Sequence, residues 1–306
     1  MTETAICTKR LAMDTTPQQD PLVTVLDIKS PVRQRAPVIF ASPHSGHLYP
    51  AEFLAQSALD PQMLRRSEDS FVDELFEAAP RFGAPLLRAL LPRAYVDVNR
   101  EPYELDPAMF TDPLPAFVNQ QSPRVGAGLG TIARVVATGS EIYRAKLTFA
   151  EAERRIEGIY RPYHAALERL VASTRAEFGC CLIIDCHSMP SIGGPNDTDA
   201  GYARVDAVLG DCYGTTCAPD VVDAVERLLA GFDYRVVRNT PYAGGFTTRH
   251  YGNPAEGRHT LQIEVNRRLY MNETTHRKLP GFDPLKEHLT HLIAMLTALP
   301  ADGLRP

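Results

Sequence analysis

Apolar residues recur along this chain in two patterns: short runs, and longer stretches with helical spacing. The mainly apolar runs at residues 38–41 and 181–185 are typical of strands buried on both faces of a parallel sheet. Further strands are predicted at residues 23–28, 85–91, 94–98, 234–237 and 259–265.

Helical spacing of apolar residues predicts helices at 58–79, 148–178, 219–229 and 284–299. Pro162 is expected to kink or divide the second of these, because proline lacks the amide that continues a helix. A loop rich in proline and glycine spans about 100–137. The alternation of strands and helices predicts one α/β domain over residues 21–306, with a mostly parallel or mixed sheet, after a flexible arm at 1–20.

Composition narrows the class of function. A net charge of -5 does not favour a nucleic-acid partner, and no run approaches the roughly 18 apolar residues of a membrane span. The start of the chain lacks a signal-peptide pattern, so we expect a cytoplasmic protein whose six cysteines are reduced. Whether Cys186 influences a metal, and the oligomeric state, are left open.

Two histidines follow the two mainly apolar runs. His44 comes after residues 38–41 and His187 after residues 181–185, each beside small polar residues. Functional groups collect beyond the carboxyl ends of strands in open α/β sheets, and imidazole is a common zinc ligand. We therefore expect a zinc site, with two unrelated loop-capping histidines as the alternative.

A catalytic zinc site also needs a third ligand and a carboxylate that accepts a proton. The acidic cluster at 68–74 is the best source of the ligand, since Asp69 and Asp73 share one face of the predicted helix. The alternative is a solvated acidic helix face. Glu264, at a predicted strand end, is the candidate general base, with an ion pair to Arg267 or Arg268 as the alternative.

Two arginine-containing segments are candidates for substrate binding. Asn99 and Arg100 follow the strand predicted at 94–98, and Arg249 and His250 follow a glycine-rich segment expected to be a mobile loop. An arginine can hold a carboxylate through two parallel hydrogen bonds. A purely surface role is the alternative for each arginine.

Six segments together resemble the N-formylglutamate amidohydrolase family. They occur in order between about residues 38 and 273, and they read PHSG from 43, EDSFVDEL from 68, DVNREP from 97, DCHSMP from 185, GFTTRHYG from 245 and QIEVNRRLYM from 262. Each segment is moderately specific alone, and their joint order is highly specific.

The resemblance implies a three-layer α/β/α fold with a mixed central sheet, of the phosphorylase/hydrolase-like type found in zinc carboxypeptidase-like hydrolases. It implies Zn²⁺-dependent hydrolysis of N-formyl-L-glutamate to formate and L-glutamate, at the end of histidine degradation. The partner is then a small N-acyl amino acid substrate, without nucleic acid or membrane.

The resemblance also implies roles for single residues. His44 and His187 match the metal ligands, Glu264 matches the catalytic glutamate, and Asn99 with Arg100 matches a pair that holds a substrate carboxylate. Relatives often have a His-x-x-Glu motif, but His47 stands three residues after His44 here. Asp69 is therefore the preferred third ligand, with His47 and Glu68 as alternatives.

Two rival functions remain at this stage. One is a related zinc N-deacylase or carboxypeptidase-like enzyme that acts on another small N-acyl amino acid. The other is a metal-free protein that binds acidic metabolites through Arg100 and Arg249.

Overall fold

A mixed seven-stranded sheet forms the centre of the fold. The structure is a computed structural model that describes residues 24–195 and 197–305, so the arm expected at 1–20 lies outside the described residues. The strand order is β1-β3-β2-β4-β7-β5-β6. The bounds are β1 Leu26–Lys29, β2 Val38–Ser42, β3 Leu86–Ala89, β4 Cys181–Met189, β5 Ala207–Gly210, β6 Val236–Arg238 and β7 Arg258–Asn266. Strands β3, β2, β4 and β7 are parallel neighbours, whereas β1 and β5 pair antiparallel with β3 and β7.

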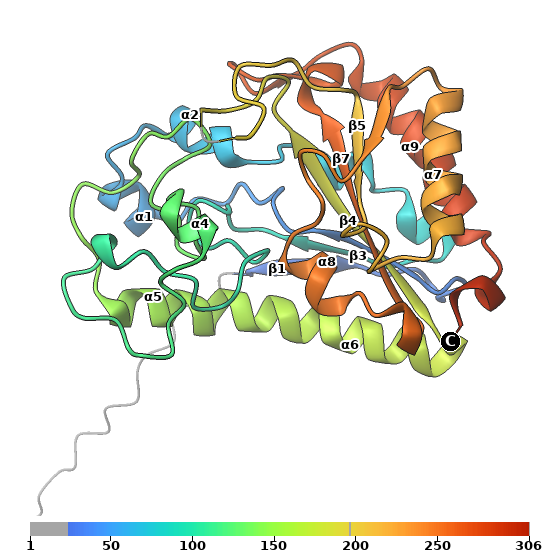
Figure 1. The fold of residues 1–306 in the computed structure, drawn as a ribbon, viewed down its shortest axis with the longest axis horizontal. Helices are drawn as coiled ribbons and strands as arrows, with labels where there is room; N and C mark the ends of the chain where they lie inside the picture. The colour runs from blue at the N-terminus through green and yellow to red at the C-terminus, as the bar shows by residue number, and fades with distance from the viewer. Residues whose placement is uncertain (1–23, 196, 306) are drawn as a thin grey trace, which may run out of the picture.

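Helices cover both faces of this sheet. Alternate residues of β4 point to opposite faces, so Leu182 and Ile184 join one hydrophobic cluster and Ile183 joins the other. Figure 1 shows α6 (Arg161–Phe178) along one side, with α7 (Pro219–Gly231) and α9 (Phe282–Thr297) on the other. The expected α/β fold with a mixed sheet is therefore confirmed.

The predicted helix at 148–178 is divided close to the expected position. It consists of α5 (Phe149–Arg155), a π-helical turn at Ile156–Tyr160, and α6. Pro162 lies in the first turn of α6, where its missing amide hydrogen is accommodated by the wider turn before it. None of the helices among residues 24–195 and 197–305 has the length and apolarity needed to cross a bilayer.

The helix predicted at 58–79 is wrong. The segment instead forms α2 (Pro61–Leu64), a 3-10 turn at Arg65–Ser67 and α3 (Val72–Leu75). Phe71 has a φ of 68°, in the left-handed region, which a continuous right-handed helix cannot contain. Asp69 and Asp73 therefore do not share a helical face.

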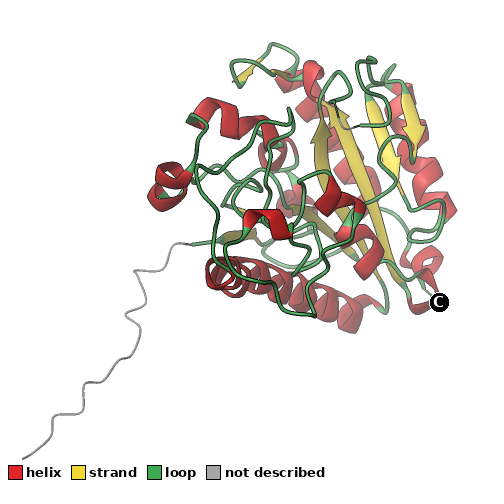
Figure 2. Cartoon of the chain, turned by 60° about the vertical axis from the view of Figure 1, so that its left-hand side comes forward, coloured by secondary structure: helices red, strands yellow, loops and turns green. Residues whose placement is uncertain are grey.

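Two further predictions fail, and one strand of the sheet was not predicted. The strand expected at 94–98 is a series of turns, in which the amide of Asp97 donates to the carbonyl of Thr131 at 2.8 Å. The segment expected to be a mobile loop before Arg249 forms the short helix α8 (Phe246–Tyr251), and β5 is not among the predicted strands. Figure 2 shows the strands gathered in one part of the molecule, with long loops and short helices beside them. The short helices include α1 (Ala51–Gln56) and α4 (Pro123–Gly126), which are labelled in Figure 1.

Arg155, the last residue of α5, connects these irregular segments to the helices α5 and α6. Its Nη1 donates to the Tyr143 hydroxyl at 2.7 Å, and its Nη2 donates to Gln56 Oε1 at 2.9 Å. Its Nε donates to Glu151 Oε1 at 2.8 Å, and its guanidinium lies 4.1 Å from the centre of the Tyr95 ring. The side chain is fully buried, so its charge is stabilised by protein groups such as these and not by water.

We predict that Arg155→Met lowers the free energy of unfolding by about 3 kcal/mol or more, because it leaves buried partners of a charged group unsatisfied. Urea denaturation followed by circular dichroism measures the change. The matched control is Arg161→Met, which removes an exposed arginine paired with Glu157 at 2.7 Å and should cost about 0.5 kcal/mol. Equal losses in the two variants would contradict the role given to Arg155.

Candidate active site

The candidate site lies where three neighbouring parallel strands end. His44 is two residues beyond β2, and His187 lies near the end of β4. Parallel pairing aligns His187 with Glu264 of β7, so both side chains leave the same face of the sheet. From β2 the chain continues first to β3 on one side and later to β4 on the other. Such a switch point opens a crevice where α/β proteins bind ligands.

Asp69 joins the two histidines. Its Oδ2 lies 3.0 Å from Nδ1 of His187 and 3.4 Å from Nδ1 of His44, and its amide donates to the His44 carbonyl at 3.0 Å. One ligand atom from each of these residues lies within 4.8 Å of the others, and all three residues are buried. Burial alone raises the pKa of Asp69, but the hydrogen bond with His187 and the close contact with His44 hold it well below its usual range.

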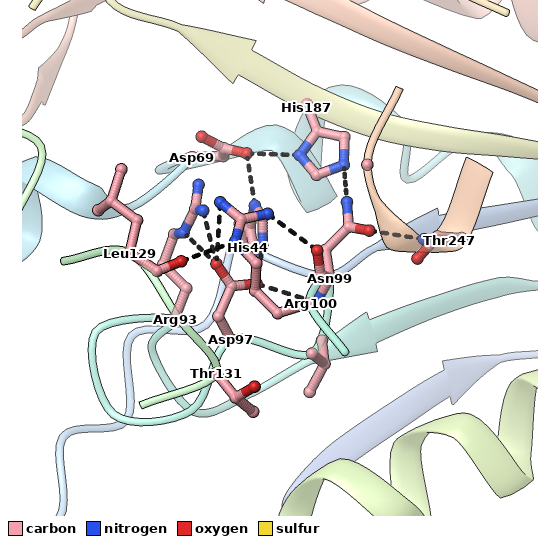
Figure 3. A network of polar contacts seen from close by, with 12 residues as sticks. His44, Asp69, Arg93, Asp97, Asn99, Arg100, Leu129, Thr131, His187 and Thr247 are labelled. Carbon is pink, nitrogen blue, oxygen red and sulfur yellow. Dashed lines mark hydrogen bonds and ion pairs between the residues drawn. The ribbon is translucent and has the colours of Figure 1, made fainter. Parts of the chain in front are cut away.

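Carboxylates also contact the outer nitrogens of both rings. Nε2 of His44 lies 2.8 Å from Asp97 Oδ1, and Nε2 of His187 lies 3.0 Å from Asp185 Oδ1. A carboxylate in this position fixes a metal-binding tautomer, with the proton on Nε2 and the Nδ1 lone pair free to bind. Figure 3 shows both Nδ1 atoms directed towards Asp69.

These residues fit a divalent cation. Among the described residues, the buried Nδ1 of His44 has no hydrogen-bond partner. Burial lowers the pKa of His187, but Asp185 and Asp69 raise it well above its usual value. A proton held there in the absence of metal is the proton that a cation displaces when histidine binds it. Two imidazoles and one carboxylate form a ligand set that zinc uses in catalytic sites.

Two arginines neutralise the carboxylates of this cluster. Arg93 contacts Asp97 Oδ2 through Nη2 at 2.6 Å and Nε at 3.1 Å. Arg267 donates to Asp69 Oδ1 at 2.9 Å, which leaves Oδ2 directed at the histidines. The alternative interpretation of Glu264 is an ion pair with Arg267, but Arg267 pairs with Asp69 instead.

Glu264 is the buried acid of the cleft wall. Burial and the nearby charge of Asp69 raise the pKa of Glu264 to about 7, against the opposing effect of His187. Its Oε1 accepts a hydrogen bond from Gln262 Nε2 at 2.9 Å. A carboxyl group with a pKa near neutrality can both accept and return a proton.

Asn99 and Arg100 follow a turn rather than a strand, and both line the cleft. The Asn99 Nδ2 atom donates to Asp185 Oδ2 at 3.1 Å, and its Oδ1 accepts from the Thr247 amide at 2.8 Å. Arg100 donates to the backbone carbonyls of Leu129 and Asn99, both at 2.9 Å, and its Nη2 lies 3.7 Å from Asp97. Asn99 thus connects β4 to α8, and the guanidinium of Arg100 is held in one orientation.

The cleft has a volume of about 300 Å³ and is lined by five arginines. They are Arg93, Arg100, Arg124, Arg249 and Arg267. Arg124, in α4, was not among the sequence candidates, and its signal is the Ser-Pro start of a short helix before a glycine-rich loop. That loop, 126–130, contributes Leu129 to the wall.

Several other candidates lie outside the cleft wall. His250 is exposed and stacks on Phe246 with ring centres 4.8 Å apart. His47 is exposed, and its Nδ1 faces the carbonyl of Ser45. Glu68 is buried but accepts hydrogen bonds from Tyr49, Ser70 and Arg65. Asp73 pairs with Arg88 at 2.7 Å.

Sequence comparison identifies related enzymes. The chain matches the family model described as N-formylglutamate amidohydrolase over residues 36–271. The N-formylglutamate deformylase of Pseudomonas putida is 28% identical over 243 residues, covering 78% of this chain and 84% of that protein. The deformylase of Pseudomonas aeruginosa is 29% identical over 245 residues, covering 79% and 84%.

Solved structures extend the comparison. The crystal structure of N-formylglutamate amidohydrolase from Ralstonia eutropha JMP134 has 40% sequence identity and a TM-score of 0.83, covering 90% of this chain and 98% of that one. The gene product Atu2144 from Agrobacterium tumefaciens shares the fold at 18% identity, with a TM-score of 0.64 and coverage of 89% and 94%. The family match spans most of the chain, and the chain therefore belongs to the N-formylglutamate amidohydrolase family.

Proposed function

We propose that this protein is a zinc-dependent amidohydrolase that converts N-formyl-L-glutamate and water to formate and L-glutamate. The observation that carries the proposal is the pair of buried histidines whose Nδ1 atoms face Asp69, with a second carboxylate behind each ring. Glu264 and the arginine-lined cleft lie beside this cluster. The family membership and the names of the relatives support the substrate.

The ligands in this proposal are His44, Asp69 and His187. Asp97 and Asp185 orient the two imidazoles, and Arg267 orients Asp69. When bound, a zinc ion acts as a Lewis acid that polarises a carbonyl and increases the acidity of water.

Glu264 is the proposed general base and then general acid. Because Gln262 occupies Oε1, we assign Oε2 to proton transfer. Oε2 takes a proton from water as the new C–O bond forms at the formyl carbon, and the proton passes to the glutamate nitrogen as the C–N bond breaks. The products are formate and L-glutamate, whose amino group is now free.

We further propose that the fold is of the zinc carboxypeptidase-like type and that residues 21–306 form a single domain. We also propose that the protein is cytoplasmic and acts in histidine degradation. A role for Asn99 in substrate binding stays a prediction, since its side chain is also engaged by Asp185 and Thr247. Metal-dependent hydrolysis of a different small N-acyl amino acid is the main competing function.

We predict about one zinc per chain, lost in His44→Ala and His187→Ala because each variant removes one of three ligands. Metal quantification after dialysis measures it, with circular dichroism to verify folding. His47→Ala is the matched control, because this exposed histidine lies three residues from His44 but outside the cluster. Full zinc occupancy in both ligand variants would refute this site, and wild-type protein without zinc would favour the metal-free binding protein.

We predict that Glu264→Gln lowers kcat by about 10²–10⁴-fold with zinc retained, because the amide preserves size but cannot accept the proton. Formate release from N-formylglutamate and metal content are measured on the same preparation. Glu256→Gln, at an exposed glutamate just before β7, is the control. Near-normal turnover of Glu264→Gln would remove the residue from the mechanism.

We predict that Arg100 binds the carboxylate next to the formylated nitrogen, because its guanidinium is buried and held at the cleft wall by two carbonyls. Lysine cannot reproduce two parallel hydrogen bonds to a carboxylate. N-formylglutamate and 4-formamidobutyrate differ only in this carboxylate, so Arg100→Lys should reduce the discrimination between them about tenfold or more. Equal losses of kcat/KM on both substrates would make Arg100 a structural residue.

A further inference from the structure

Arg124 and Arg249 lie at the mouth of the cleft, on two elements far apart in sequence. Arg124 belongs to α4 and Arg249 to α8. Both line the main cleft and also a smaller adjoining pocket of about 80 Å³. The two cavities also share Asn99 and Arg100. Three arginines therefore line both cavities: Arg100, Arg124 and Arg249.

These two arginines differ from the other cations of the cleft. Arg93 is neutralised by Asp97, and Arg267 by Asp69. Within residues 24–195 and 197–305, neither Arg124 nor Arg249 forms an ion pair. Their charges are therefore available to a ligand.

The acids in this region do not cancel the positive charge. Glu101 and Glu104 line the smaller pocket, where Glu101 accepts from Asn119 Nδ2 at 2.9 Å and Glu104 accepts from the Ser122 hydroxyl. Both donors are neutral. Arg100 also lies 3.7 Å from Asp97, which pairs with Arg93, so four arginines are set against three carboxylates in this region. Burial, together with the positive charges of Arg93 and Arg124 and against the opposing charge of Asp97, lowers the pKa of Arg100 to about 10. An anionic ligand relieves this repulsion.

Hydrogen bonds connect the backbone that carries Arg124 and Arg249 to the segment around Arg100. Ser122 caps the start of α4 by accepting from the Val125 amide at 3.1 Å, and its hydroxyl donates to Glu104. The first turn of α8 is held by the Thr247 amide donating to Asn99 at 2.8 Å. Segments that hold a charge in place reduce the ordering cost of binding a ligand.

We propose that Arg124 and Arg249 bind the side-chain carboxylate of an acidic N-acyl amino acid and so select glutamate over glutamine. This inference rests on the proposed function, in which Arg100 binds the other carboxylate. Two guanidiniums favour a charged carboxylate over an amide, because the amide carries no charge and its NH₂ group repels a second donor.

The test compares ligands that differ only in the side-chain carboxylate. Calorimetry with the purified holoenzyme measures binding of L-glutamate and L-glutamine to wild type, Arg124→Gln, Arg249→Gln and Arg124→Lys. We expect each glutamine variant to reduce the preference for L-glutamate about 10- to 100-fold, and the lysine variant to reduce it less. Arg169→Gln, which removes an exposed arginine of α6 outside the cleft, controls for net charge and should behave like wild type.

Formate release is then measured with N-formylglutamate and N-formylglutamine on the same proteins. A parallel loss of preference in kcat/KM supports the subsite. An unchanged preference in both Arg124→Gln and Arg249→Gln, or no preference in wild type, overturns it. Absence of formate release by wild type instead overturns the proposed function, and the calorimetry still decides whether these arginines select the carboxylate.

Discussion

Strands β4 and β7 are parallel partners, and their pairing begins with Cys181 opposite Arg258 and ends with Met189 opposite Asn266. This register places His187 opposite Glu264. A one-residue shift would turn the opposite face of β4 to the cleft and replace His187 there with Cys186 or Ser188. In the actual register Cys186 points into the hydrophobic cluster beneath α7 and α9, where burial raises the pKa of its thiol. Register therefore decides which side chains reach the catalytic face.

Acidic groups alternate with arginine and imidazole groups at the centre of the site. From Arg93 the contacts continue through Asp97, His44, Asp69 and His187 to Asp185, so each carboxylate has an arginine or imidazole neighbour. Buried carboxylates without partners are very costly, so these contacts depend on one another. The same contacts leave two nitrogens and one carboxylate oxygen close together, which is the arrangement that the proposed metal site requires.

The irregular segments determine the shape of the cleft. Turns carry Asp97, Asn99 and Arg100 to the strand ends, and their position depends on packing against α5 and α8. Arg155 donates to the carbonyl of Tyr95 and so connects this segment to the long helix. The strands and their ends thus supply the two histidines and the proposed base, while the turns and short helices supply Asp69 and the arginines proposed to bind the substrate's carboxylates.

Local sequence patterns alone predict most of the buried strands, the helical stretches at 148–178, 219–229 and 284–299, and three of the central side chains, because apolar periodicity and strand-end polarity are local properties. His44, His187 and Glu264 were predicted in this way, whereas Asp69 was chosen from the acidic cluster at 68–74 on a helical face that the structure does not form. The helix predicted at 58–79 failed because apolar spacing cannot reveal the left-handed Phe71. Folding alone brings Asp97 to His44 and places Arg124 and Arg249 on the wall of one cleft, while Asp185 reaches His187 from two residues away on the same strand. Apart from that last contact, these residues are distant in the chain, and the energies of their interactions depend on burial and charge that exist only after folding.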